Sequence, residues 1–258
     1  MERMAKKVWN GKGLLMDNRA IFFGSKSVYY DENAKIQQNV VEETIKFADE
    51  NISQLETGLW LDLGSGTGLI HKKSNKKLNI VSLDISYLTL LKSENPICCD
   101  FDNLSFIDNS FDKIISCSAL QWSKNLENAA KNFYNALKTD GKLIIAVFGS
   151  GTLGNLQFLQ KEFGIKSLVS FYKQEYLEDI LQKAEFSVVA KKEKIFFQKF
   201  DNAYSALKNI SKIGATNHGG KILSPKKLKD FVREYENSFA ENEIIHNYRT
   251  FFYISEKR

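Results

Sequence analysis

The sequence is poor in the features that mark membrane, secreted and metal-binding proteins. None of its apolar runs approaches the roughly twenty residues that a membrane-spanning helix needs, and no signal peptide opens the chain. Its three cysteines form no disulfide framework, because Cys98 and Cys99 are adjacent and Cys117 stands alone, and its three histidines are scattered. We therefore expect a cytoplasmic protein without a metal site, in which the cysteines are core residues on buried strands.

Length and composition are those of a globular α/β protein. The chain has 258 residues, of which 43% are hydrophobic and 26% charged, so it can bury a sizeable core as a single domain. No repeat, low-complexity tract or linker rich in proline and glycine divides it. We expect a helical cover over residues 18–50, a nucleoside-binding core over 58–200, a helical insert over 201–240 that covers the pocket, and a final strand over 243–256.

The hydrophobic periodicity alternates between that of strands and that of helices, which predicts a doubly wound sheet. The predicted strands cover residues 59–63, 78–83, 96–99, 111–119, 143–148, 187–200 and 244–254. The predicted helices lie around residues 36–48, 126–137, 177–184 and 206–213, and a last one begins at Ser224-Pro225. Thr139-Asp140-Gly141 is predicted as a turn, and the short stretch between Asp84 and Asp100 predicts a truncated second helix.

The most informative motif is an apolar strand that leads directly into a loop with glycine at every second position, Gly64-Ser65-Gly66-Thr67-Gly68. Glycine permits a positive φ and lets a ligand approach the backbone, and the helix that follows directs free N–H groups at a bound anion. A dinucleotide motif would need its third glycine at position 69, which is Leu69. The loop therefore favours a smaller nucleoside ligand.

Three acidic residues mark the ends of three successive predicted strands. Asp62 lies in the first, Asp84 ends the second, and Asp100 closes the third. A carboxylate in the position of Asp84 can accept both ribose hydroxyls, and Asp100 can accept the adenine amino group. Each feature alone has a simpler explanation, since a glycine loop is often a tight turn and an aspartate a helix cap. The ordered set predicts an adenosine-like ligand.

This ordered set resembles the class I S-adenosylmethionine-dependent methyltransferases. Three further segments, residues 116–122 (SCSALQW), 148–153 (FGSGTL) and 207–216 with the core IGAT, are similar to the malonyl-acyl-carrier-protein O-methyltransferases of biotin synthesis. The ALQW sequence alone also resembles methyltransferases of small acids such as aconitate. The N-terminal segment fits the biotin family through Phe23-Gly24, Tyr30-Asp31, Ala34 and Gln37. The residues before Met16 have no counterpart in the family, so they are either an extension or precede the true start.

The resemblance implies a Rossmann-like fold with a seven-stranded, mostly parallel sheet, and S-adenosylmethionine as cofactor. Cys99 replaces a small glycine that the family often has before its third acid. The cofactor-binding residues are expected to be Phe23, Tyr30, Gln37, Asp62, Gly64, Ser65, Gly66, Gly68, Asp84, Ile85, Asp100, Phe101, Ser116 and Leu120.

The implied reaction is O-methylation of the free carboxylate of malonyl-acyl-carrier protein or malonyl-CoA, which masks its charge for chain-elongating enzymes. A carboxylate has an unperturbed pKa of about 4 and is already ionised at neutral pH, so no catalytic acid or base is expected. Candidate substrate contacts are Tyr30, Gln121, Trp122 and His218. Arg19 and Arg249 are candidates for a bidentate clamp on the carboxylate.

Lysines are clustered in a chain whose net charge is +5. The clusters are Lys72, Lys73, Lys76 and Lys77; Lys191, Lys192 and Lys194; and Lys221, Lys226, Lys227 and Lys229. They are either a solvated surface or the docking surface for a small acidic carrier protein, and they lack the arginines and aromatics that nucleic acid would need. Two other functions stay open: a methyltransferase of another small carboxylic acid or quinone precursor, and a non-catalytic adenosine-binding module that holds RNA or a protein.

Overall fold

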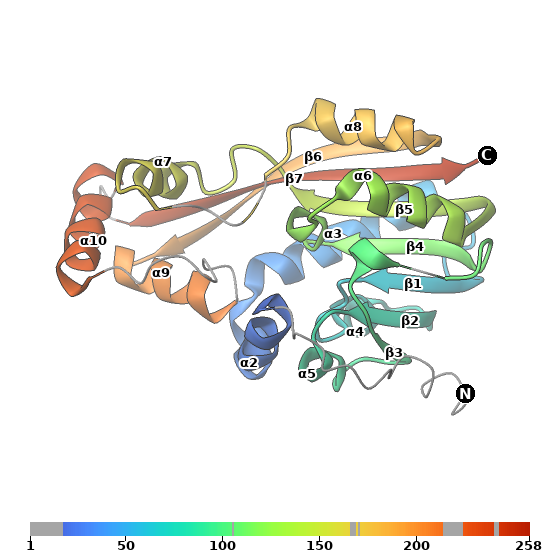
Figure 1. Ribbon diagram of the computed structural model, residues 1–258, viewed down its shortest axis with the longest axis horizontal. Helices are drawn as coiled ribbons and strands as arrows, with labels where there is room; N and C mark the ends of the chain where they lie inside the picture. The colour runs from blue at the N-terminus through green and yellow to red at the C-terminus, as the bar shows by residue number, and fades with distance from the viewer. Residues whose placement is uncertain (1–17, 105, 166–168, 170, 214–223, 240–242) are drawn as a thin grey trace.

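The computed structural model describes residues 18–104, 106–165, 169, 171–213, 224–239 and 243–258. Its centre is a seven-stranded sheet with the strand order β3-β2-β1-β4-β5-β7-β6 (Figure 1). The strands are β1 Leu59–Leu63, β2 Asn79–Asp84, β3 Pro96–Cys98, β4 Phe111–Cys117, β5 Leu137–Phe148, β6 Phe186–Phe200 and β7 Ile244–Lys257. Strands β1 to β5 are parallel, whereas β7 runs antiparallel to both β5 and β6. The predicted mostly parallel, seven-stranded sheet is confirmed.

Helices cover both faces of this sheet, which is why its central strands are apolar throughout. The helices are α2 Asn18–Asn33, α3 Lys35–Asn51, α4 Leu69–Lys73, α5 Tyr87–Leu90, α6 Leu126–Ala136, α7 Gly154–Glu162, α8 Gln174–Lys183, α9 Ala203–Lys212 and α10 Pro225–Phe239, with short 3₁₀ turns at Phe101–Asn103 and Leu120–Trp122. One core cluster joins α6 and α8 to the sheet, and a second joins α3 and α4 to its other face.

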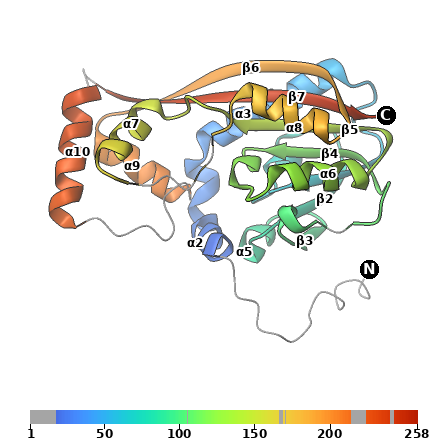
Figure 2. The same ribbon diagram turned by 45° about the horizontal axis from the view of Figure 1, so that its top comes forward.

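A third apolar cluster lies away from the sheet's centre. It joins α7 to α9 and α10 through side chains that include Leu156, Ile210 and Phe231, together with Ile244 at the start of β7. Figures 1 and 2 show these three helices grouped at the end of the molecule where β7 begins, with α2 between them and strands β1 to β3. The insert between β6 and β7 thus packs beside α7, a helix that the sequence pattern did not predict.

Two predicted local features differ from the structure. Strand β5 begins at Leu137, and the predicted turn becomes an irregularity within it, marked by a positive φ of 62° at Asp140. The prediction that Cys98 and Cys99 lie on a buried strand is wrong, because all three residues of β3 are exposed and Cys99 is only half-buried. The predicted truncated second helix is confirmed as the four-residue α5, which is too short to cover this edge strand.

The described helices include none that is both long and apolar enough to cross a membrane. Nor do the described residues contain a group of three or more His, Cys, Asp or Glu side chains placed to hold a metal ion.

Candidate cofactor and substrate site

The glycine loop turns sharply between β1 and α4. Gly64, Gly66 and Gly68 have φ values of 69°, 55° and 79°, which side-chain-bearing residues rarely adopt. At Gly64 a Cβ would also lie 2.4 Å from the Cβ of Ala119, so no side chain fits there. The N–H groups of Gly64 and Ser65 donate to the carbonyl of Leu83 at 2.8 and 3.0 Å. The loop is therefore held against the end of β2, close to Asp84.

Asp84 supports this loop directly. Its Oδ2 accepts a hydrogen bond from the N–H of Gly66 at 2.9 Å, and its Oδ1 accepts one from Ser86 at 2.8 Å. Each carboxylate oxygen has two lone pairs, so both retain capacity for a ligand hydroxyl. Burial raises the pKa of Asp84, whereas the two backbone donors act in the opposite direction.

Asp62 is 2% exposed and lies behind the loop. Burial, reinforced by the charge of Asp84, raises its pKa to about 8.

A cavity of about 430 Å³ opens beside the loop. This volume lies within the range of roughly 300 to 1,000 Å³ that is usual for small-molecule sites. The loop and the strand ends form one side of it, and the other walls include residues of α2, α3, α7, α9, α10 and β7. Nucleoside-facing residues and insert residues thus line a single space.

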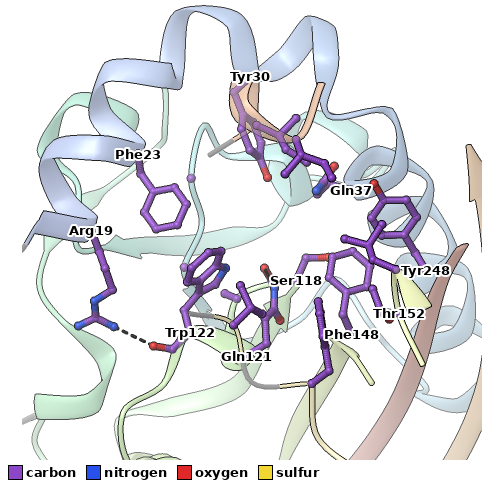
Figure 3. A pocket seen from close by; sticks show the side chains of 18 of the residues that line it. Arg19, Phe23, Tyr30, Gln37, Ser118, Gln121, Trp122, Phe148, Thr152 and Tyr248 are labelled. Atoms are coloured by element: carbon purple, nitrogen blue, oxygen red, sulfur yellow. Dashed lines mark hydrogen bonds between the residues drawn. The ribbon is translucent and has the colours of Figure 1, made fainter. Parts of the chain in front are cut away.

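Polar atoms without partners face this cavity. Gln37 Oε1, Gln121 Oε1, Ser118 Oγ and Tyr248 Oη are all buried, and none has a hydrogen-bond partner among the described residues. Figure 3 shows these four side chains around the cavity, with Gln37 on one side and Gln121 and Ser118 on the other. Buried polar atoms are normally satisfied, so the two amide oxygens fit a ligand that carries several donors, whereas the two hydroxyls can donate as well as accept. S-adenosylmethionine carries such donors in its ammonium group, its ribose hydroxyls and its adenine amino group.

Arg19 closes the wall of the cavity instead of pointing freely into it. Its Nη2 pairs with Asp100 Oδ2 at 2.7 Å, and its Nη1 donates to the carbonyl of Trp122 at 2.9 Å (Figure 3). The ring of Phe23 meets that of Trp122 edge to face, with their centroids 5.2 Å apart. These contacts fix α2 against the ends of β3 and β4.

The structure places twelve of the predicted site residues on the cavity lining: Arg19, Phe23, Tyr30, Gln37, Gly64, Gly66, Asp84, Ile85, Asp100, Phe101, Gln121 and Trp122. Asp62, Ser65, Gly68, Ser116 and Leu120 do not line it. Ser116 Oγ donates to the carbonyl of Leu63 at 3.0 Å, and Leu120 packs in the main core. His218 lies outside the described residues.

Arg249 does not line the cavity either. Its Nε and Nη2 bind the two carboxylate oxygens of Glu193 at 2.6 and 3.0 Å on the neighbouring strand β6. The structure thus gives both candidate arginines carboxylate partners within the protein. Sequence reasoning missed the apolar residues that line the far part of the cavity and also Tyr248, because in a helix or strand pattern such residues are indistinguishable from core.

Comparisons with known proteins identify relatives of this chain. A family model described as "Methyltransferase domain" matches residues 61–145, which contain the loop, Asp84 and Asp100. The chain is 29% identical over 251 residues to the malonyl-[acyl-carrier protein] O-methyltransferase of Bacillus cereus, covering 89% of this chain and 93% of that protein. It is 24% identical to the biotin biosynthesis bifunctional protein BioHC of Saccharophagus degradans, covering 83% of this chain and 41% of that longer protein.

Among solved structures, a putative methyltransferase from Bacillus halodurans matches with a TM-score of 0.61 at 13% identity, covering 84% of this chain and 98% of that one. Fold, loop and family model together define a class I S-adenosylmethionine-dependent methyltransferase, as predicted. Within that class, the chain is similar over nearly its whole length to the malonyl-acyl-carrier-protein O-methyltransferases. The predicted cofactor, S-adenosylmethionine, is confirmed.

Proposed function

We propose that the protein methylates the free carboxylate of a malonyl group carried on acyl carrier protein, an early step of biotin synthesis in the cytoplasm. The observation that carries this proposal is the single cavity shared by the nucleoside-facing residues and the insert. A second reactant can lie beside the cofactor there, which a purely adenosine-binding module would not need. The similarity to the B. cereus protein over 89% of the chain supports malonyl-acyl-carrier protein as that reactant.

The polar and apolar residues that line the cavity indicate which side chains bind each part of the cofactor. Asp84 accepts the ribose hydroxyls, Ile85 and Phe101 provide apolar surface for the adenine, and Gln37 accepts from the ammonium end. Bound S-adenosylmethionine supplies a methyl group on a sulfonium, which passes to the carboxylate oxygen while the S–C electron pair returns to sulfur. The protein's contribution is orientation, an effect that can supply roughly 7 to 11 kcal/mol, and exclusion of water by α2 and the insert.

The lysine clusters differ in a way that favours one docking surface for the carrier. In the β6 lysine cluster, Lys191 pairs with Glu178, and Lys192 and Lys194 both pair with Glu43. The first cluster is also paired, since Lys72, Lys73 and Lys76 bind Asp31, Glu42 and Asp49.

By contrast, the α10 lysine cluster, Lys226, Lys227 and Lys229, is exposed and has no ion-pair partner within the described ranges. Leu228, in the middle of this cluster, is 47% exposed and also lines the cavity. The α10 lysine cluster thus stands at the cavity mouth with its charge available to an acidic partner. We assign carrier docking to this surface, with the insert acting as the cover of the site.

Rescue of biotin synthesis tests the proposed function. The wild-type gene should restore growth without biotin to bacterial cells that lack their carboxyl methyltransferase, and an Asp84→Ala variant expressed at the same level should not. Failure of the wild type to rescue, together with methyl transfer to another carboxylic acid or to a quinone precursor in vitro, would replace malonyl-acyl-carrier protein with that substrate.

A further inference from the structure

The far part of the cavity offers a substrate carboxylate no available cation. Its walls are mainly leucine, isoleucine and phenylalanine side chains, among them Phe148, Leu156, Ile210 and Phe231. Of the described residues that line the cavity, Arg19 alone is cationic, and its guanidinium already binds Asp100 and the carbonyl of Trp122. A negatively charged methyl acceptor must therefore be held there by neutral groups.

Tyr248 is the neutral group best placed to do this. It lies on β7, lines the cavity, is only 3% exposed and packs against Phe148 with ring centroids 5.5 Å apart. Its hydroxyl has no hydrogen-bond partner among the described residues. Leaving a buried hydroxyl without a hydrogen-bond partner is costly, so we expect a ligand or a water molecule to bind the hydroxyl of Tyr248.

Two other polar side chains in this part of the wall, Thr152 and Gln157, are already occupied by the protein. Thr152 Oγ1 donates to the carbonyl of Arg249 at 3.0 Å and accepts from its N–H at 3.1 Å. The amide of Gln157 donates to the carbonyl of Thr152. The Tyr248 hydroxyl thus differs from these neighbours in having its donor still available.

We propose that Tyr248 Oη donates a hydrogen bond to the methyl-accepting carboxylate, to which the protein offers no counter-cation; this assignment rests on the proposed function. A neutral donor orients the carboxylate without neutralising it, so the oxygen that attacks the methyl group keeps its nucleophilic lone pair. Burial raises the pKa of Tyr248, which keeps the hydroxyl protonated as a donor across the working pH range. The apolar walls also suit the neutral ester that forms.

The test compares two tyrosine-to-phenylalanine variants that each remove one buried, unpartnered hydroxyl. Tyr248→Phe removes the proposed donor, whereas Tyr235→Phe removes a hydroxyl that is also unpartnered in the described structure but does not line the cavity. Loss of a hydrogen bond to a charged group should lower kcat/KM for a malonyl thioester by about 10- to 100-fold in Tyr248→Phe, mainly through KM. Affinity for S-adenosylhomocysteine, measured by calorimetry, should stay within about twofold in both variants.

Three results would overturn the assignment. An unchanged KM in Tyr248→Phe, with an active wild type, refutes it alone and leaves the proposed function intact. Equal losses in Tyr248→Phe and Tyr235→Phe, or a matching loss of cofactor affinity, show a structural effect of the hydroxyl instead of substrate binding. A wild type that transfers no methyl group to any malonyl thioester refutes the proposed function and the assignment with it.

Discussion

Replacing Asp84 with alanine should weaken cofactor binding severely while leaving the protein folded. In the protein, Asp84 already accepts hydrogen bonds from the N–H groups of Gly66 and Ser86 at 2.9 and 2.8 Å. In the complex it should also accept from both ribose hydroxyls. Hydrogen bonds to a charged group contribute about 1.5 to 3 kcal/mol each, so loss of the two ribose contacts costs about 3 to 6 kcal/mol. The dissociation constant should rise about 10²- to 10⁴-fold.

The assay is isothermal titration of S-adenosylhomocysteine into the purified variant. Asp112→Ala is the matched control, because Asp112 Oδ2 likewise accepts a backbone N–H, from Leu59 at 2.8 Å, and also binds Lys138 at 2.8 Å. Asp112 does not line the cavity, so its loss should reduce stability without changing cofactor affinity. Binding by Asp84→Ala within about twofold of wild type would show that this carboxylate only caps the loop.

Further predictions concern the loop, the buried acid and the docking surface. Gly64→Ala should destabilise the fold by about 1 to 3 kcal/mol, because of its φ of 69° and the clash with Ala119, whereas Gly154→Ala meets open space and should be tolerated in thermal unfolding.

The folded-state pKa of Asp62, about 8, lies above its ordinary value of 3.8, so the folded state holds the proton more tightly. The free energy of unfolding should then fall as pH rises between these two pKa values and level off above pH 8. Asp62→Asn should flatten this pH dependence, measured by urea titration at several pH values. An unchanged slope in that variant would refute the prediction. Charge reversal of the α10 lysine cluster should slow turnover of the carrier-bound substrate more than that of a small malonyl thioester, and added salt should reduce this difference. Charge reversal of the β6 lysine cluster should mainly reduce the stability of the protein, because these lysines form ion pairs. Equal effects on both substrates would remove the docking assignment.

The sequence was most informative where the chemistry is local. The loop from Gly64 to Gly68 and the acid at Asp84 could be identified because a positive φ and a strand-end carboxylate each depend on a few adjacent residues. The core helices and strands followed from periodicity, since burial on one face imposes a regular spacing of apolar residues. The main architecture and the cofactor end of the site were therefore predictable.

Contacts between distant segments were not predictable. The pairing of Arg19 with Asp100 joins residues 81 positions apart, and no local pattern indicates it. The segment containing Ser116 and Leu120 was identified, but which of its side chains turn into the core depends on the packing of β4. Tyr248 lies in a strand whose apolar pattern is the same whether a side chain faces core or cavity, so only the structure distinguishes it.

The most direct test of the proposed function is the intact mass of a malonyl-loaded acyl carrier protein after incubation with the enzyme and S-adenosylmethionine. The carrier should gain one methyl group, this gain should leave the carrier together with the acyl group when the thioester is cleaved, and Asp84→Ala should abolish the gain. A carrier of unchanged mass, in a reaction where S-adenosylmethionine is consumed with another acid or a quinone precursor, would contradict it.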